Sequence, residues 1–596
     1  MRNPLPQTWN LERFFPGGSG SDAFNQFLKE LQSNIVELDE TLSGLAVPER
    51  AEQSASLLPV IVLVQTAFLK IREAESFTGC LTAENQNDKR AVQLTGQVKS
   101  IQAAYASALT RFDDFLRRVP ESAWQGLLAH AELNEIAYPL EERRRLASEK
   151  LPPEQEALIH DLAVDGYHGW GELYNTTVSK FSIPFEENGG VTELSAGRAA
   201  NKMYSPDRSV RQRVFELWER EWAKHADYCA DALNHLGGFR LKLYERRGWD
   251  EIHREPLTIN RMSKETLDAM WGVIEQSKDV FVRYLERKAK LLGVEKLAWH
   301  DVDAPVGQGS TTFSYDQGAQ LIVEQFRRFS PKMAEFAEMA FESSWIEAED
   351  RAGKRPGGFC TSFPISEETR IFMTYAGTAS NVSTLAHELG HAYHQHVMND
   401  LPALAQDYAM NVAETASTFA EMVVSDAAVK GAATDEERLT LLEDKIQRSV
   451  AFYMNIHARF LFETDFYEER RQGLVSIERL NELMEAAQKK AYRDALAEYH
   501  PHFWASKMHF YLTDVPFYNF PYTFGYMFST GLYAEALRRG AAFEDQYIAL
   551  LRDTGRMTVE DLASKHLGVD LRKPDFWQQA MDVTIADVNE FLRLTE

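Results

Sequence analysis

The sequence predicts a mostly α-helical fold. Apolar residues recur at intervals of three and four through much of the chain, the spacing that places them on one face of a helix. Glycine (33 residues) and proline (21 residues), which interrupt helices, are sparse in a chain of 596 residues. Because 44% of the residues are hydrophobic, a chain of this length can bury a large core, and we expect two or more lobes.

The first helix is predicted over 21–38, where Ser21 or Asp22 can cap it. Its apolar side chains follow at helical spacing: Phe24, Phe27, Leu28, Leu31, Ile35 and Leu38. Comparable helical stretches recur at 95–118, 206–245, 264–292, 316–342, 436–463 and 476–498. No repeat of fixed period and no low-complexity segment accompanies them, so the sequence does not predict a solenoid.

The clearest internal boundary is "FSIPFEENGGVTEL", residues 181–194. A proline and a pair of glycines break the helical pattern there. We therefore expect an N-terminal helical lobe over 1–190 and a second, larger region over 191–596.

Two short runs further along are typical of strands. "TSFP" (361–364) and "RIFMTYAGT" (370–378) are rich in Thr, Phe, Ile and Tyr, which favour extended backbone. A helix follows, predicted to start after Ser380 or Asn381 and to continue to about Met398. A small sheet is thus expected directly before a helix that is rich in histidine.

That helix contains "TLAHELGHAYHQH", residues 384–396. Residues four apart lie on one face of a helix, so His387 and His391 can present two imidazoles to one ion, and Glu388 can reach a water bound to it. This is H-E-x-x-H, the zinc motif in which the glutamate acts as general base. By chance a chain of this composition would hold roughly 0.04 such pentamers. We expect one Zn²⁺ per chain, with Gly390 permitting a close approach of another segment.

Two further histidines follow in the same helix. His394 stands where a longer zinc motif has glycine, and Val397 where that motif has its third histidine, so the longer motif is absent. His394 lies one turn beyond His391 and is expected to support the site or to pack in the core. His396 points elsewhere and is expected to be exposed.

A catalytic zinc needs a third protein ligand, which must come from a carboxylate downstream. Asp400 falls in the turn that ends the helix, and Asp407 precedes the next periodic segment. Glu414, in "NVAETASTFAE", is the better candidate because it shares a helical face with Glu421. Glu421 remains the alternative ligand.

The bulk properties exclude several classes of partner. A formal net charge of −25 disfavours phosphate backbones and anionic lipid, so we expect no nucleic acid and no membrane partner. Cys80, Cys229 and Cys360 are odd in number and far apart, as in proteins of a reducing compartment. The N-terminus lacks the pattern of a secretory signal, and the apolar run 57–69 is shorter than a membrane span. A buried helix at 57–69 and a cytoplasmic location are predicted, while the oligomeric state stays open.

Several spaced motifs together resemble one family. "TLAHELGHAYHQH" followed by "ETASTFAE", with "GGFCTSFP", "RIFMTYAGT" and "HFYLTDVPFYNFPYTFGYMFSTGLYAEAL", is similar to the oligoendopeptidase F branch of the thimet oligopeptidase-like zinc peptidases. The resemblance covers most of 200–575. It implies a largely helical, two-lobed ellipsoid with a deep channel, the zinc helix at its floor and a small β-sheet beside that helix. Such a channel admits short unstructured peptides and excludes folded proteins.

The C-terminal part contains eight aromatic residues between 510 and 526. A peptidase needs hydrogen-bond donors aimed at the oxyanion of its tetrahedral intermediate. By the resemblance, these donors are His509, Tyr518 and Tyr522, with Tyr526 in reserve. The remaining aromatic residues are expected to pack in the core.

These observations predict a zinc-dependent endopeptidase that hydrolyses internal bonds of short peptides. The resemblance implies that His387, His391 and Glu414 hold zinc, and Glu388 would take the proton from the attacking water. It also implies that one of the two predicted strands pairs with the substrate backbone, which binds peptides without reading many side chains.

Two alternatives remain open. One is a zinc carboxypeptidase of similar fold, in which an Arg or Lys binds the free carboxylate of the substrate. The other is a non-catalytic, zinc-stabilised peptide-binding protein, against which Glu388 argues, because a structural site has no use for an unliganded base.

Overall fold

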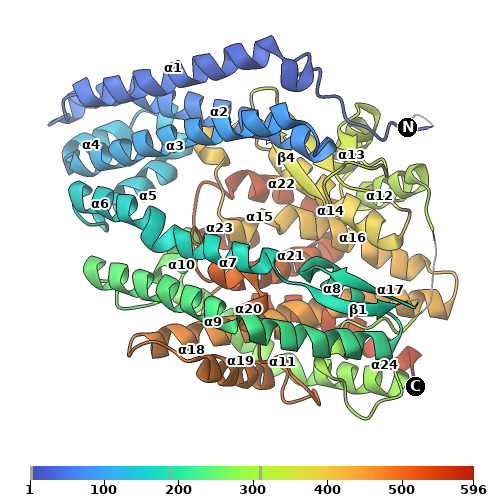
Figure 1. Ribbon diagram of the computed structural model, residues 1–596. Coiled ribbons are helices and arrows are strands. Elements are labelled where there is room, and N and C mark those ends of the chain that lie inside the picture. The colour runs from blue at the N-terminus through green and yellow to red at the C-terminus, as the bar shows by residue number, and fades with distance from the viewer. Residues whose placement is uncertain (1–3, 188, 308–311) are drawn as a thin grey trace. The chain divides into compact units, whose positions relative to one another are not determined.

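Helices make up most of the structure, a computed structural model that describes residues 4–187, 189–307 and 312–596 (Figure 1). The mostly α-helical fold predicted from the sequence is confirmed. The chain forms two compact units, each built from three separate stretches. Unit 1 comprises Met1–Lys150, Thr311–Val424 and Glu535–Gly568. Unit 2 comprises Leu151–Ser310, Ser425–Ala534 and Val569–Glu596.

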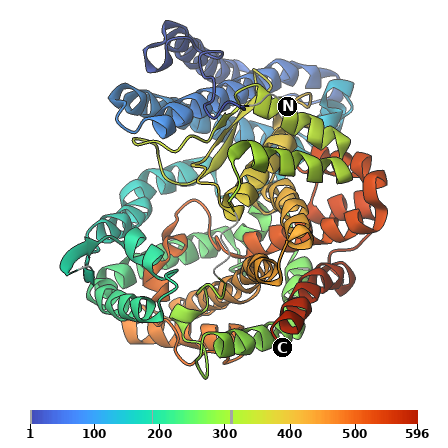
Figure 2. The same cartoon turned by 90° about the vertical axis from the view of Figure 1, so that its right-hand side faces the viewer.

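The helices of unit 1 include a long N-terminal group, α1, α2 and α3, which lie side by side (Figure 2). Apolar side chains at helical spacing explain their packing, because Phe24, Leu28 and Leu31 of α1 are buried. The helices that begin in unit 1 are α1 (Asp22–Gly44), α2 (Leu58–Glu84), α3 (Lys89–Arg118), α4 (Glu121–Leu128), α5 (Ala137–Ser148), α12 (Tyr315–Phe329), α13 (Pro331–Glu342), α14 (Ala379–His396), α15 (Met410–Ala413), α16 (Thr415–Gly431), α22 (Glu544–Asp553) and α23 (Val559–Leu567).

Unit 1 also contains a three-stranded sheet in the order β3-β5-β4. The central strand β5 (Glu368–Phe372) pairs in parallel with β3 (Ile346–Glu347) and antiparallel with β4 (Phe359–Phe363). All of β5 is buried, whereas most of β4 is only half-buried, as expected of an edge strand. Both β4 and β5 contact α14, so the small sheet predicted beside the histidine-rich helix is confirmed.

Among its described residues, unit 2 is helical apart from a two-stranded ribbon, β1 (Ile183–Glu187) with β2 (Gly190–Leu194). The proline and glycine pair in 181–194 thus mark an antiparallel hairpin. The helices that begin in unit 2 are α6 (Pro153–Ala163), α7 (Gly169–Ser179), α8 (Ala196–Lys202), α9 (Arg208–Arg247), α10 (Arg254–Ile259), α11 (Lys264–Leu291), α17 (Asp435–Val450), α18 (Ile456–Arg470), α19 (Ile477–Ala491), α20 (Phe503–Ser506), α21 (Phe520–Arg539) and α24 (Pro574–Leu594).

Two predicted helices differ from the observed ones. The stretch 316–342 is divided into α12 and α13 at Ser330, which precedes a proline and adopts the extended backbone that this position favours. The stretch 436–463 contains a π-helical turn, Ala451–Asn455, between α17 and α18. In both places the apolar period continues across the interruption, so periodicity alone does not reveal it.

The segment Ala51–Glu84 is long and apolar enough to cross a membrane when only length and composition are considered. Its helix α2 buries one face in unit 1, including Val60, Ile61 and Val64. The buried helix predicted over 57–69 is confirmed for that face.

Candidate functional site

The histidine-rich helix α14 begins earlier than the sequence predicts. Thr378 caps it, because its hydroxyl accepts a hydrogen bond from the Asn381 backbone N–H at 3.1 Å. The Asn381 side chain in turn accepts a hydrogen bond from the backbone N–H of Thr378 at 3.3 Å. This reciprocal capping box replaces the predicted cap at Ser380 or Asn381, since Asn381 is its inner partner.

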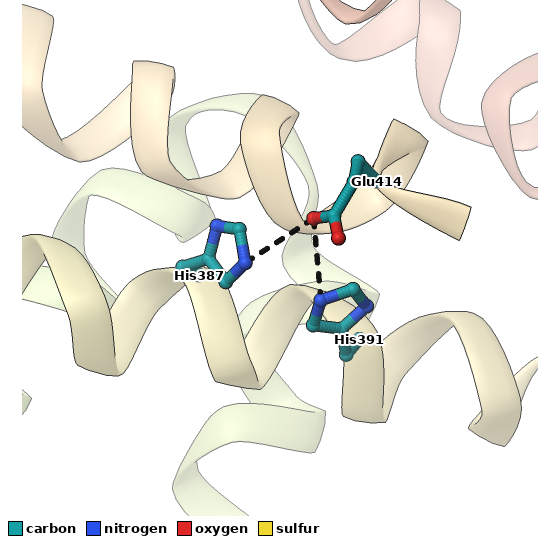
Figure 3. Close-up of side chains that lie close together, drawn as sticks. All are labelled: His387, His391 and Glu414. Carbon is teal, nitrogen blue, oxygen red and sulfur yellow. Dashed lines mark ion pairs between the residues drawn. The ribbon is translucent and has the colours of Figure 1, made fainter. Parts of the chain in front are cut away.

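The structure brings together His387, His391 and Glu414 (Figure 3). One carboxylate oxygen of Glu414, Oε2, lies 3.3 Å from Nε2 of His387 and 3.4 Å from Nε2 of His391. The histidines lie one turn apart on α14, and Glu414 lies between α15 and α16. We call these three residues the metal group.

The metal group fits a zinc ion. Zn–N and Zn–O bonds of about 2.0–2.2 Å in a tetrahedral arrangement separate neighbouring ligand atoms by about 3.3–3.6 Å. The two distances to Glu414 Oε2 fall in this range, and all three ligand atoms lie within 4.8 Å of one another. Two imidazoles and one carboxylate are also a donor set that catalytic zinc accepts, with one position left for water.

The local sequence explains how Glu414 reaches α14. A Cβ at Gly390 would lie 2.4 Å from the carbonyl oxygen of Ala416 and 2.6 Å from Cα of Ser417. Only glycine permits this backbone approach, as the sequence predicted. The Ser417 hydroxyl donates a hydrogen bond to Glu414 Oε2 at 2.7 Å.

Electrostatics favour the ionised form of Glu414. Burial raises its pKa, but hydrogen bonds to His387 and His391 and their charges outweigh that effect and hold the pKa well below its ordinary value. Glu414 is therefore a carboxylate at neutral pH, the form that binds a metal.

Glu421 contacts the metal group through the other ring nitrogen of His387. Its Oε2 is 3.3 Å from Nδ1 of His387, while the Nε2 of that ring faces Glu414. A carboxylate on the far nitrogen of a metal-binding histidine orients the ring and increases its basicity. Glu421 therefore has the geometry of a residue that orients His387.

Glu388 follows His387 and is only 7% exposed. Burial raises its pKa, the charges of His387 and His391 lower it, and Glu414 raises it further, so that the net shift is upward. A Cβ at Gly358, which precedes β4, would lie 3.5 Å from Oε1 of Glu388. The start of the edge strand therefore approaches the carboxylate closely.

The other residues considered from the sequence lie elsewhere. His394 is fully buried, contacts the Thr554 hydroxyl at 2.9 Å and stacks on Tyr408, so it packs in the core of unit 1. His396 is exposed, as expected. Asp400 forms an ion pair with Arg552 at 2.5 Å.

In unit 2, His509, Tyr518 and Tyr522 form a cluster of rings. Ring centroids lie 5.4 Å apart for His509 and Tyr518, 5.4 Å for Tyr518 and Tyr522, and 6.4 Å for His509 and Tyr522. Burial, followed by the charges of Arg459 and Lys507, lowers the pKa of His509 to about 4. This aromatic cluster thus contains a neutral imidazole at neutral pH.

The loop that carries Tyr518 is held by a buried acid that the sequence did not single out. Glu463 of α18 accepts hydrogen bonds from the Phe517 backbone N–H at 3.0 Å and from the Asn519 side chain at 2.7 Å. Phe517 has a φ of 53°, a strained value for an aromatic residue. Glu463 thus fixes both neighbours of Tyr518.

A second anchor holds the start of the same loop. The Thr513 carbonyl accepts hydrogen bonds from Arg240 at 3.0 Å and from the Tyr167 hydroxyl at 3.1 Å. The Thr513 hydroxyl lies 2.7 Å from Nδ1 of His168. No local motif links Thr513 to its three partners, because it follows each of them by 273 or more positions.

Tyr526, the reserve candidate, lies within α21. It is buried, its hydroxyl is 2.9 Å from that of Ser449, and its ring stacks on Phe452. Burial raises its pKa to about 12. These contacts are those of a packing residue.

Comparison with known proteins gives a family match over most of the chain. Residues 201–583 match Peptidase family M3, and residues 116–182 match Oligopeptidase F. An oligoendopeptidase F homolog of Lactococcus lactis subsp. lactis (strain IL1403) is 26% identical over 435 residues, which cover 71% of this chain and 70% of the relative. Oligopeptidase PepF of Bacillus subtilis (strain 168) is 22% identical over 587 residues, covering 95% of this chain and 84% of the relative.

Solved structures share the fold. Oligoendopeptidase-F from Enterococcus faecium matches with a TM-score of 0.70 at 18% identity, covering 96% of this chain and 98% of that chain. A protein of Chlamydophila abortus matches with a TM-score of 0.84 at 17% identity, covering 99% and 98%. Together with the family matches, these findings confirm the resemblance found in the sequence.

Proposed function

The chain belongs to peptidase family M3, and from that premise we propose that it is a zinc-dependent endopeptidase that hydrolyses internal bonds of short, unstructured peptides. The observation that carries the proposal is the metal group, His387, His391 and Glu414, with Glu388 beside it. A purely structural metal site would not need an unliganded carboxylate at that position.

The chain's own residues have separate roles. When bound, zinc supplies Lewis acidity toward the scissile carbonyl and lowers the pKa of water. Glu388 takes the proton of the attacking water on its carboxylate and later donates it to the leaving amine. Its buried position and raised pKa favour the first step, because a carboxylate with a higher pKa is the stronger base and accepts the proton of the water more readily.

The aromatic cluster is proposed to supply the oxyanion donors. His509, Tyr518 and Tyr522 offer N–H and O–H groups, which act where negative charge develops in the transition state. The cluster and the two anchors of the Tyr518 loop support this role, since a donor must be positioned before the reaction begins.

The substrate backbone is proposed to pair with β4. The central strand β5 has β3 on one side and β4 on the other, whereas β4 has a strand neighbour on only one side within the described residues. The Ser362 carbonyl of β4 accepts a hydrogen bond from Ser76 of α2 at 2.6 Å, so the start of β4, near Glu388, is the better place for a peptide.

The remaining features are proposed from the sequence pattern, the net charge of −25 and the family resemblance. A two-lobed arrangement, with an N-terminal lobe over 1–190 and a catalytic region over 191–596, would enclose a channel that admits only short peptides. The protein would act in the cytoplasm on peptides and not on nucleic acid or membranes.

Incubation with peptides of graded length tests the proposal, with and without a chelator. Mass spectrometry should find cleavage at internal bonds, loss of cleavage with chelator and recovery with added zinc. Peptides with a blocked C-terminus should still be cut, whereas a carboxypeptidase would require the free end. Equal cleavage of folded protein and short peptide would contradict the channel, and metal-independent cleavage would contradict the mechanism.

A further inference from the structure

Two cations lie beside the aromatic cluster of unit 2. Arg459 of α18 and Lys507, which precedes His509, both approach the ring of Phe503. The Arg459 Cζ lies 5.4 Å and the Lys507 Nζ lies 5.0 Å from that ring centroid. The two charged groups are therefore within about 10 Å of each other, and we call them the cation pair.

Neither cation has a carboxylate partner among the described residues. Arg459 uses its Nε to donate a hydrogen bond to the Asn455 side chain at 2.9 Å, which leaves its two terminal nitrogens for another acceptor. Glu463 lies one turn further along α18 but bonds to Phe517 and Asn519 instead. Asp303 interacts electrostatically with Lys507 without forming an ion pair with it.

Arg459 and Lys507 are half-buried, and they differ from two fully buried cations elsewhere in unit 2. Lys288 pairs with Glu443 at 2.8 Å, and Arg211 pairs with Asp301 at 2.9 Å. Burying a cation without a partner is costly, so a fold retains such a group where an anion binds or where the cost serves another purpose.

The electrostatic surroundings agree with an anion site. Burial lowers the pKa of Lys507 to about 8 and that of Arg459 to about 10. The same two charges contribute to the low pKa of His509, and Arg459 interacts electrostatically with Tyr522. A positive potential therefore reaches the proposed oxyanion donors.

An anion bound by the cation pair would belong to a molecule that enters the site, because no described carboxylate pairs with either cation. A net charge of −25 disfavours polyanions, whereas a short peptide carries a terminal carboxylate and often an acidic side chain. A guanidinium and an ammonium both bind carboxylate through charge-assisted hydrogen bonds. We propose that Arg459 and Lys507 form a subsite, next to His509 and Tyr522, that binds a carboxylate group of the peptide substrate; this inference rests on the proposed function.

Three versions of one cleaved peptide test it: the free acid, the C-terminal amide, and the free acid with its internal glutamate replaced by glutamine. For the unaltered protein, removing the recognised carboxylate should lower kcat/KM by about 10-fold to 100-fold. We call the kcat/KM of the peptide with the carboxylate, divided by the kcat/KM of the peptide without it, the carboxylate ratio. In Arg459→Gln and Lys507→Gln the carboxylate ratio should fall toward one. A lower kcat/KM for the C-terminal amide identifies the terminal carboxylate as the bound group, and a lower kcat/KM for the glutamine peptide identifies the glutamate side chain. Either result supports the subsite.

Arg479→Gln is the matched control, because Arg479 is an exposed cation of unit 2 that pairs with Glu469. It should leave the ratio unchanged. Arg459→Lys and Lys507→Arg keep the positive charge, so they should retain part of the preference for the peptide with the carboxylate. These two variants test the subsite even if a glutamine variant fails to fold.

The inference would be overturned if removing the carboxylate changed kcat/KM by the same factor in the unaltered protein and in both glutamine variants. It would also be overturned if removing neither carboxylate changed kcat/KM of the unaltered protein. Absence of chelator-sensitive cleavage of any peptide would instead overturn the proposed function and the inference with it. The two failures are therefore distinguishable.

Discussion

The metal group of unit 1 and the aromatic cluster of unit 2 are built in different ways. His387, Glu388 and His391 lie within five consecutive positions of one helix, so the helical repeat alone places them. The aromatic cluster depends on the irregular loop before α21, whose conformation is set by Glu463, more than fifty positions earlier. Local periodicity places the two histidines and Glu388 of the first region, the close approach at Gly390 adds Glu414, and long-range hydrogen bonds build the second region.

The two regions also differ in charge. Around the metal group, three carboxylates, those of Glu388, Glu414 and Glu421, lie close to two imidazoles. Around the aromatic cluster, Arg459 and Lys507 supply positive charge. A site that binds a cation and a site that binds an anion need these opposite environments, and the comparison can be tested region by region.

The largest effect is expected at the third metal ligand. Glu414→Ala removes the only carboxylate near both Nε2 atoms within the described residues, so the zinc content should fall from near one per chain toward zero, and activity with it. Metal analysis of the purified protein measures this directly.

Two neighbouring acids are controls for that experiment. Asp407→Ala should leave the zinc content unchanged. Glu421→Ala should weaken zinc binding by about 10-fold to 100-fold, because it removes the partner of His387 Nδ1. Loss of metal in Glu421→Ala with retention in Glu414→Ala would reverse the ligand assignment.

The next effect concerns the base. Glu388→Gln keeps the size of the side chain, and Glu388 is not one of the three residues of the metal group, so the zinc content should remain near one per chain. The variant cannot accept the proton of the attacking water, and kcat should fall by about 10²-fold to 10⁴-fold. Steady-state kinetics with metal analysis decides, and near-normal turnover with zinc present would exclude Glu388 as the base.

The sequence predicted the first region well because its determinants are local. The spacing of His387 and His391 and the glycine at 390 are visible in a single stretch. Glu414 was predicted on a helical face shared with Glu421, but it lies between α15 and α16, and both carboxylates reach His387 on different ring nitrogens. The exact cap, Thr378, was missed because several residues in a row can cap a helix and only the side-chain geometry distinguishes them.

The second region was predicted only in part. The resemblance pointed to His509, Tyr518 and Tyr522, but nothing in the sequence pairs Glu463 with Phe517 and Asn519. A buried acid has no pattern in the chain, because its partners are chosen by the packing of α18 against a loop. The same holds for the cation pair, since basic residues are common and only the structure shows which ones lack a carboxylate.

A smaller effect is expected for the aromatic cluster. An oxyanion donor acts more strongly in the transition state than on bound substrate, so Tyr518→Phe or Tyr522→Phe should lower kcat by tens- to hundreds-fold with little change in KM. At least one of the two, and His509→Ala, should show this defect with unchanged zinc. Wild-type kcat in all three variants would place the donors elsewhere, with Tyr526 the next residue to test.

The smallest effect concerns the acid that holds the Tyr518 loop. Burial raises the pKa of Glu463 from its ordinary value of 4.5 to about 8, although the Phe517 N–H, Arg240 and the Asn519 side chain each lower it. Tyr467, which also packs here, interacts electrostatically with Glu463 and is itself neutral because burial raises its pKa. The folded protein therefore binds a proton at Glu463 between about pH 4.5 and pH 8 that the unfolded chain has released.

The sign of the pH dependence follows from that proton. Its contribution to stability is fully present below the unfolded pKa, near 4.5, and is lost as the pH rises through about 8, with a slope of about 1.4 kcal/mol per pH unit. Glu463→Gln cannot titrate, so the apparent unfolding temperature of the unaltered protein minus that of the variant should fall steadily from pH 5 to pH 8. A difference that stays constant over this range would show that Glu463 is ionised throughout, and the loop would then be held by a permanent charge.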